Sequence, residues 1–199
     1  SVAISMNELS NHDHSRFLTR TNRTVGRTNT LGPEAANNNV NKAVFKEAVV
    51  MQMTLPGAPT VYYGDEAGVC GFTDPDNRRT YPWGHEDTEL IDFHRAAIKM
   101  HKENDVLRKG SYKSLYSAYN VVAYGRFTSD DAAIIIVNKV RARIPAWEVG
   151  LGFDDDVEQL LVTFEGGYST DRLGYHLQNG WLDIGLRKTS AVVLHKMKW

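Results

Sequence analysis

The most constraining feature of this 199-residue sequence is a change of pattern near residue 106. Before it, short apolar runs alternate with stretches of helical periodicity, and after it short strand patterns and turn signals follow one another. Alternating strands and helices are typical of parallel sheets covered by helices, whereas closely spaced strands are typical of antiparallel sheets. We therefore predict an α/β part over residues 1–105 and an all-β part over residues 106–199.

The α/β part predicts the order strand, helix, strand, helix. Val2–Met6 is a short apolar run, and residues 38–54 have helical spacing with Asn37 or Asn38 available as a cap. Residues 58–63 form an apolar run that suits a strand buried on both faces. The one-sided apolar face predicted for this first helix consists of Val40, Val44, Ala48 and Met51.

A second helix is predicted over residues 88–103, capped by Asp87 or Thr88. Residues 64–86, between the second strand and this helix, form a long glycine-bearing loop, and such loops are often functional. The apolar stripe predicted for the second helix consists of Leu90, Phe93, Ala97 and Met100.

The all-β part shows several short strand patterns and no helical segment. Asn179-Gly180 lies between two of them and favours a two-residue hairpin, because both residue types accept a positive φ. So many short strands in about 90 residues indicate an antiparallel sandwich. The strands are predicted over residues 121–126, 132–137, 157–164, 175–178, 181–184 and 191–194.

Composition excludes several classes of function. The 23 Lys and Arg residues balance 24 Asp and Glu residues, which is unlike the cationic surface of a nucleic-acid or anionic-membrane binder. No run approaches the ~18 apolar residues that a membrane helix needs, so we expect neither a nucleic-acid nor a membrane partner. The single cysteine, Cys70, excludes an internal disulfide and fits the cytoplasm, which is the expected location.

Two polar segments carry the chemistry, and each follows a predicted strand. In the first, Asn11-His12-Asp13, a carboxylate that can accept two hydroxyl hydrogen bonds stands beside an imidazole that can donate one. Such groups could hold a sugar and favour an oxocarbenium-like transition state. In the second segment, Asp74 and Arg78 follow in the long loop. Turn formation at the first segment and a simple ion pair at the second explain the same residues without function.

Together the two segments resemble the α-amylase family of glycoside hydrolases. Asn11-His12-Asp13 followed by Arg16-Phe17-Leu18 is similar to the block that ends the family's seventh barrel strand. Residues 57–66, GAPTVYYGDE, are similar to its eighth strand and the loop that follows. Gly71, Asp74-Pro75, Arg78 and Trp83 are similar to the neopullulanase and cyclomaltodextrinase branch.

This resemblance implies the last two βα units of a (β/α)₈ TIM barrel, followed by an antiparallel C-terminal β-sandwich. It implies that Asp13 is a catalytic carboxylate that holds two hydroxyls of the sugar at the cleavage site. It also implies that His12 binds the same sugar and that Asp74 and Arg78 bind the next sugar of an α-glucan or maltooligosaccharide. Arg16 would be structural.

The other catalytic groups of this family are missing from the sequence. A retaining glycosidase needs a nucleophile and an acid about 5 Å apart, and the family's nucleophile follows an Arg-x-Asp pattern that does not occur here. We therefore expect a C-terminal fragment that is inactive alone, partners with the remainder of the barrel and self-associates through open strand edges.

Other readings stay open at this stage. A non-catalytic carbohydrate-binding or partner-binding protein derived from the family, or an independent sandwich module, fits the same sequence. No cofactor is expected. The run Asp154-Asp155-Asp156 is typical of a solvated turn, with calcium as an alternative, and the histidine spacings do not suit zinc. Trp147 and Trp181 are interpreted as buried, and Trp83 as close to the sugar cleft.

Overall fold

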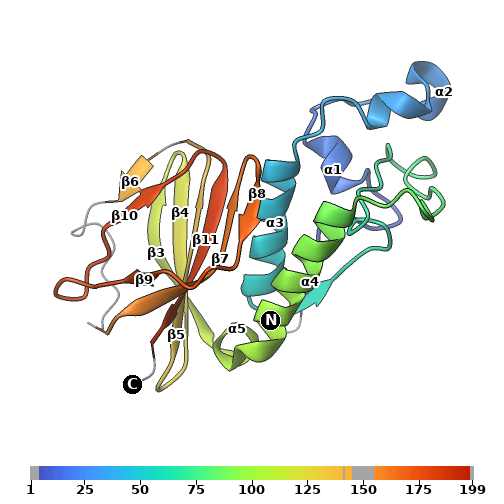
Figure 1. The fold of residues 1–199 in the computed structure, drawn as a ribbon. Helices are drawn as coiled ribbons and strands as arrows, with labels where there is room; N and C mark the ends of the chain where they lie inside the picture. Colours follow the sequence, from blue (N-terminus) through green and yellow to red (C-terminus); the bar gives the residue numbers. More distant parts are fainter. Residues whose placement is uncertain (1–4, 141, 145–154, 198–199) are drawn as a thin grey trace.

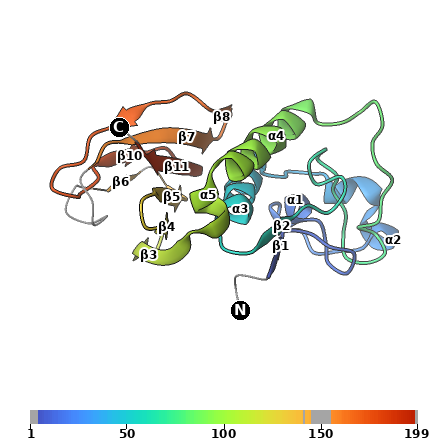
Figure 2. The ribbon, with the colours of Figure 1, turned by 90° about the horizontal axis from the view of Figure 1, so that it is seen from below.

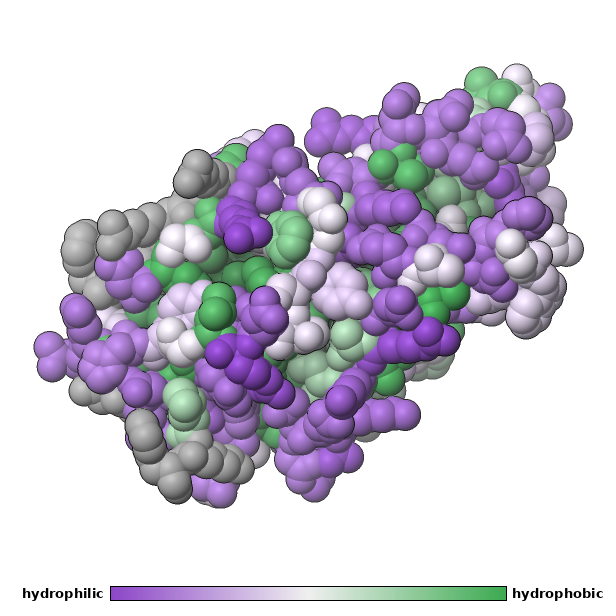
Figure 3. Space-filling model, viewed as in Figure 1, coloured by the Kyte–Doolittle hydropathy of each residue, from purple (hydrophilic) through white to green (hydrophobic). Residues whose placement is uncertain are grey.

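The computed structural model describes residues 5–140, 142–144 and 155–197. A layer of helices separates a large antiparallel sheet from a region of long loops and a two-stranded sheet (Figures 1 and 2). The surface seen in Figure 3 is largely hydrophilic, with small apolar areas between the polar ones. None of the helices described is long and apolar enough to cross a bilayer.

The two-stranded sheet is parallel, as the strand–helix–strand order predicts. Strand β1 (Met6–Glu8) pairs with β2 (Ala58–Thr60), and α3 (Lys42–Thr54) lies between them in the chain. Gln52 Nε2, on α3, donates to the backbone carbonyls of Asn7 and Thr60 at 3.0 and 2.8 Å, so that one side chain ties the helix to both strands. Residues 1–4 of the predicted first strand lie outside the described residues, and β1 extends past Met6 to Glu8.

Helix α3 differs from its prediction in its cap and in its buried face. The cap is Asn41, whose Oδ1 accepts hydrogen bonds from the backbone N–H groups of Ala43 and Val44 at 3.0 and 3.1 Å. The predicted face is only half-buried, because α3 is packed between α4 (Thr88–Glu103) and the large sheet. Contact on two sides buries most of the helix, including Phe45, Lys46, Glu47, Val49, Val50 and Met53.

Helix α4 matches its prediction in bounds, cap and stripe. Asp87 accepts a 3.1 Å hydrogen bond from the backbone N–H of Leu90, and all four residues of the predicted stripe are buried. The remaining helices are short. They are α1 (Phe17–Arg20), α2 (Thr28–Leu31), the 3₁₀ turn η2 (Pro33–Ala36) and α5 (Asp105–Lys109). The expectation of no helix after residue 106 is wrong, since α5 carries the chain from α4 into the sheet.

The large sheet is antiparallel, as predicted, with strand order β3-β4-β5-β11-β7-β8 and with β9 paired to β7. A smaller pair, β10 and β6, lies over it. Asn179 and Gly180 have φ values of 53° and 77° and turn the chain between the bridged residues Gln178 and Trp181. The strands are β3 (Ser111–Ala118), β4 (Val121–Phe127), β5 (Ala132–Asn138), β6 (Ala142–Ile144), β7 (Val157–Phe164), β8 (Gly167–Ser169), β9 (Gly174–Tyr175), β10 (Ile184–Leu186) and β11 (Ser190–Lys196).

Both faces of this sheet are buried at its centre. On β5, Ile135 packs in the core shared with α3 and α4, while Ile134 and Ile136 pack in the core beneath β10. The second layer of the sandwich is therefore small, and the helices cover the opposite face. The sequence did not predict that the helices and the sheet would share a core.

Candidate active site

His12 and Asp13 lie in a turn that begins three residues after β1. The turn is closed by Asn11, whose Oδ1 accepts hydrogen bonds from the backbone N–H groups of Asp13 and His14 at 2.9 and 3.1 Å. This geometry leaves the side chains of His12 and Asp13 facing outward, and each is 64% exposed. The His12 Nε2 and Asp13 Oδ1 atoms are 3.4 Å apart, so the imidazole and the carboxylate can act on one ligand.

Asp74 and Arg78 lie in the long loop that follows β2. Arg78 Nε donates to Asp74 Oδ1 at 2.5 Å. The Asp74 side chain is 44% exposed and the Arg78 side chain is 49% exposed. The loop is braced by α2, because Asp76 Oδ2 accepts a 2.8 Å hydrogen bond from the backbone N–H of Thr28. Arg27 also donates to the carbonyl of Asp74. The ion pair that was the non-functional alternative for these residues is therefore formed, and its two side chains remain accessible to a ligand.

The structure brings these two segments into direct contact. Thr73 Oγ1 donates to the backbone carbonyl of Asp13 at 2.9 Å. The buried Asn77 donates from Nδ2 to the carbonyls of Asn11 and His14 at 3.0 and 2.6 Å. The two segments that carry the four predicted site residues thus form one cluster of adjacent loops. Nothing in the sequence distinguishes Asn77 from the turn residues around it.

Arg16 is fully buried beneath the cluster. Its Nε donates to the carbonyl of Asn77 at 3.0 Å, and its Nη1 donates to the carbonyl of Tyr63 at 2.6 Å and to Asp65 Oδ1 at 3.0 Å. The guanidinium carbon also lies 4.1 Å from the centre of the Tyr62 ring. These contacts fit the structural role expected of Arg16. Burial raises the pKa of Asp65, and hydrogen bonds from Ser10 and Arg16 oppose that rise.

The exposed groups of this cluster suit a polyhydroxylated ligand. Carboxylates accept hydrogen bonds from hydroxyl groups, while the Arg78 guanidinium and an imidazole N–H donate them. Trp83, 79% exposed, lies in the same loop and packs against Tyr81 with ring centres 4.4 Å apart. Trp181 is 36% exposed rather than buried, and Trp147 lies outside the described residues.

Within the described part of the chain, no three His, Cys, Asp or Glu side chains are arranged to hold a metal ion. Of the acidic run considered for calcium, Asp154 lies outside the described residues. Asp155 forms a 2.8 Å ion pair with Lys196, and Asp156 contacts His176. The absence of a cofactor requirement stays a prediction.

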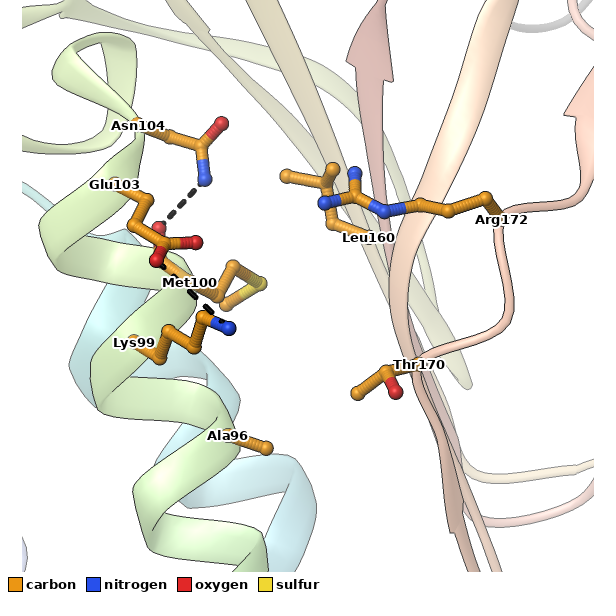
Figure 4. A pocket seen from close by; sticks show the side chains of 8 residues that line it. All are labelled: Ala96, Lys99, Met100, Glu103, Asn104, Leu160, Thr170 and Arg172. Atoms are coloured by element: carbon orange, nitrogen blue, oxygen red, sulfur yellow. Dashed lines mark hydrogen bonds and ion pairs between the residues drawn. The ribbon is translucent and has the colours of Figure 1, made fainter.

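A cavity of about 330 Å³ lies elsewhere, between α4 and the large sheet (Figure 4). Lys99 and Glu103 reach into it from the helix and Arg172 from the sheet side. None of the four predicted site residues lines it, and its charged side chains are paired, Lys99 with Glu103 at 3.9 Å and Arg172 with Glu158 at 3.2 Å. We therefore place the candidate site at the cluster formed by the two loops.

Known proteins resemble this chain in sequence and in fold. The family model described as "Alpha amylase, catalytic domain" matches residues 2–122. An amylopullulanase of Thermoanaerobacter thermohydrosulfuricus is 37% identical over an alignment of 188 positions that covers 82% of this chain and 12% of the relative. A cyclomaltodextrinase of Thermoanaerobacter pseudethanolicus is 33% identical over 137 residues, or 68% of this chain and 21% of the relative.

A solved α-amylase from Geobacillus thermoleovorans has a similar fold, with a TM-score of 0.76 at 22% identity. The match covers 98% of this chain and 39% of that structure. This chain thus spans a small part of the length of the relatives it matches. With the family model over more than half of its residues and relatives above 30% identity, the chain belongs to the α-amylase family.

Proposed function

We propose that this chain is the C-terminal part of a retaining α-glucan hydrolase that acts on starch-derived oligosaccharides. One observation carries the proposal: the turn with His12 and Asp13 and the loop with the Asp74–Arg78 pair are in contact beyond the carboxyl ends of two adjacent parallel strands. Enzymes built on (β/α)₈ barrels have their active sites at that end of the strands. In this proposal β1 and β2 are the last two strands of such a barrel, and the antiparallel sheet is the C-terminal domain.

The exposed side chains then have distinct roles. Asp13 holds two hydroxyls of the sugar at the cleavage site, and its negative charge stabilises the oxocarbenium-like transition state. His12 donates a hydrogen bond to the same sugar. The Asp74–Arg78 pair holds the next sugar: the carboxylate accepts hydrogen bonds from its hydroxyls, and the guanidinium donates to them.

The reaction also needs a carboxylate nucleophile and a carboxylic general acid on either side of the scissile bond. We assign both to the part of the barrel outside this chain, which would dock on β1 and β2. The chain alone is therefore expected to release no product from starch, pullulan or cyclodextrin above a buffer blank.

A graft tests the proposal. The matching segment of the Thermoanaerobacter thermohydrosulfuricus amylopullulanase is replaced by the corresponding part of this chain, and hydrolysis of pullulan and starch is measured. The grafted enzyme is expected to be active, and Asp13→Asn is expected to lower kcat by about 100-fold or more, since it removes a charge acting on the transition state. Asp92→Asn, on the exposed face of α4, is the matched control and should leave kcat unchanged.

Full activity of the Asp13→Asn graft would contradict the catalytic assignment. A second measurement addresses the non-catalytic reading, in which the chain by itself binds α-glucan. Retention of this chain on a maltodextrin gel, together with an Asp13→Asn graft as active as its parent, would support that reading instead.

A further inference from the structure

The side-chain amide of Asn77 links the two segments of the candidate site. Its Nδ2 donates to two backbone carbonyls, those of Asn11 at 3.0 Å and His14 at 2.6 Å. These carbonyls lie at the two ends of the turn that carries His12 and Asp13. Both N–H bonds of the amide are used, and a rotated amide would place Oδ1 against two other oxygens, so the orientation of the side chain is fixed.

The backbone of Asn77 is held as firmly as its side chain. Its carbonyl accepts a 3.0 Å hydrogen bond from Nε of the fully buried Arg16, and Asn77 itself is 0% exposed. Gly71 packs closely beneath it, since a Cβ at that position would stand 2.8 Å from the Asn77 Cα. Asn77 is thus anchored in the protein interior.

Asn77 also belongs to the turn that presents the ion pair of the other segment. Within that turn the backbone N–H of Asp76 donates to the carbonyl of Thr73 at 3.0 Å, and that of Arg78 donates to the carbonyl of Pro75 at 3.1 Å. A shift of Asn77 therefore moves Arg78 relative to Asp13.

We propose that Asn77 is a positioning residue that sets the spacing between Asp13 and the Asp74–Arg78 pair. This role rests on the proposed function. In that function, Asn77 fixes the distance between the two positions in the site that bind adjacent sugars of the α-glucan. It touches no sugar itself and acts through the two carbonyls it holds.

Asn77→Asp is the sharpest test, because it keeps the shape of the side chain and removes both donors. The signals followed are the backbone amides of Asp13 and His14 in ¹⁵N NMR spectra of the complete 199-residue chain. We expect both signals to shift and both amides to exchange faster with solvent. At about pH 4 the new carboxyl is protonated and can donate one hydrogen bond, so acidification should partly restore the original amide signals and their protection from exchange.

Asn138→Asp is the matched control. Asn138 is also buried and its Nδ2 also donates to two carbonyls, those of Val140 and Arg187, but it lies in the large sheet. It should lower stability without moving the amide signals of Asp13 and His14. If either Asp variant does not fold, Asn77→Ser and Asn138→Ser, which each retain a donor, replace the pair. Unchanged Asp13 and His14 signals in the Asn77 variant, or equal changes in the control, would overturn the proposal.

The grafted enzyme supplies the kinetic readout. Asn77→Asp is expected to lower kcat/KM by about 100-fold, the size of loss that a displacement of about 1 Å in an active site causes. Asn138→Asp should leave kcat/KM of the folded enzyme unchanged, and unchanged kinetics in the Asn77 variant would overturn the positioning role. An active Asp13→Asn graft would instead reject the proposed function, and the amide signals would still decide whether Asn77 holds the turn.

Discussion

Arg126, in β4, donates a 2.6 Å hydrogen bond from Nη1 to the backbone carbonyl of Thr54, the last residue of α3. The same guanidinium donates to the carbonyl of Leu107 at 2.8 Å and, through Nε and Nη2, to that of Gly110 at 3.1 and 2.7 Å. Next to it, the Tyr124 hydroxyl and Thr54 Oγ1 are 2.6 Å apart. The helical and the all-β parts are therefore joined by a buried polar network as well as by an apolar core.

Arg126→Met should destabilise the chain strongly, because it leaves the carbonyls of Thr54, Leu107 and Gly110 buried without a donor. We expect a loss of about 3–5 kcal/mol in the free energy of unfolding, measured by urea denaturation. Tyr124→Phe, which removes one hydrogen bond of the same network, should cost about 1 kcal/mol. Arg95→Met, on the exposed face of α4, is the control and should change stability by less than about 0.5 kcal/mol. An Arg126 variant as stable as this control would refute the importance of the network.

Glu47 should make stability depend on pH. Burial raises the pKa of its carboxyl from 4.5 to about 8, against the attraction of Lys139. Between these two values the folded chain holds the proton that the unfolded chain has lost. The free energy of unfolding should therefore fall as pH rises through this window and change no further above it.

Glu47→Gln removes this titration. The free energy of unfolding of the variant, relative to that of the unmodified chain, should therefore increase as pH rises. At about pH 9 we expect the variant to be the more stable by at least about 1 kcal/mol in denaturation curves. The exposed Glu103→Gln on α4 serves as a control. A constant difference between Glu47→Gln and the unmodified chain from about pH 4 to pH 9 would contradict this prediction.

The Asp74–Arg78 pair should matter for activity and hardly at all for stability. Both side chains are about half exposed, so either Asp74→Asn or Arg78→Gln should change the free energy of unfolding by less than about 1 kcal/mol. In the grafted enzyme each should lower kcat/KM about 10-fold or more, and the double variant should lose little beyond either single one, because the pair acts as a unit. Arg95→Gln breaks a more exposed ion pair, that with Asp92, and should alter neither property.

The open edges of β1 and β2 should cause self-association of the isolated chain. Each strand has three residues, and within the described part of the chain they pair only with each other. Light scattering after size-exclusion chromatography should show a mass that rises with concentration. Met6→Lys places a charge on the 64% exposed Met6 and should reduce association, as charges on strand edges do, whereas Tyr119→Lys in an exposed turn should not. A monomer at every concentration would contradict the prediction.

Local sequence was sufficient where an element depends on its own neighbours. Helix α4 has one apolar stripe and a capping Asp87, and both the stripe and the cap were found as predicted. Asn179-Gly180 likewise turned the chain where predicted, because these residue types accept positive φ in any surroundings. The two polar segments were identified from their residues, and their contact followed from the parallel pairing of the strands before them.

Tertiary structure decided what depends on residues far apart in the chain. The buried face of α3 could not be read from its period, because two layers of the fold cover it and bury Lys46 and Glu47 with the apolar side chains. Asn77 looked like any turn residue until its amide was seen holding carbonyls more than 60 residues away. Sequence alone determined the cap of α4, the turn at Asn179-Gly180 and the types of chemical group at the site, since these rest on local sterics and hydrogen bonding. The fold decided their spacing and burial, because packing between distant segments sets both.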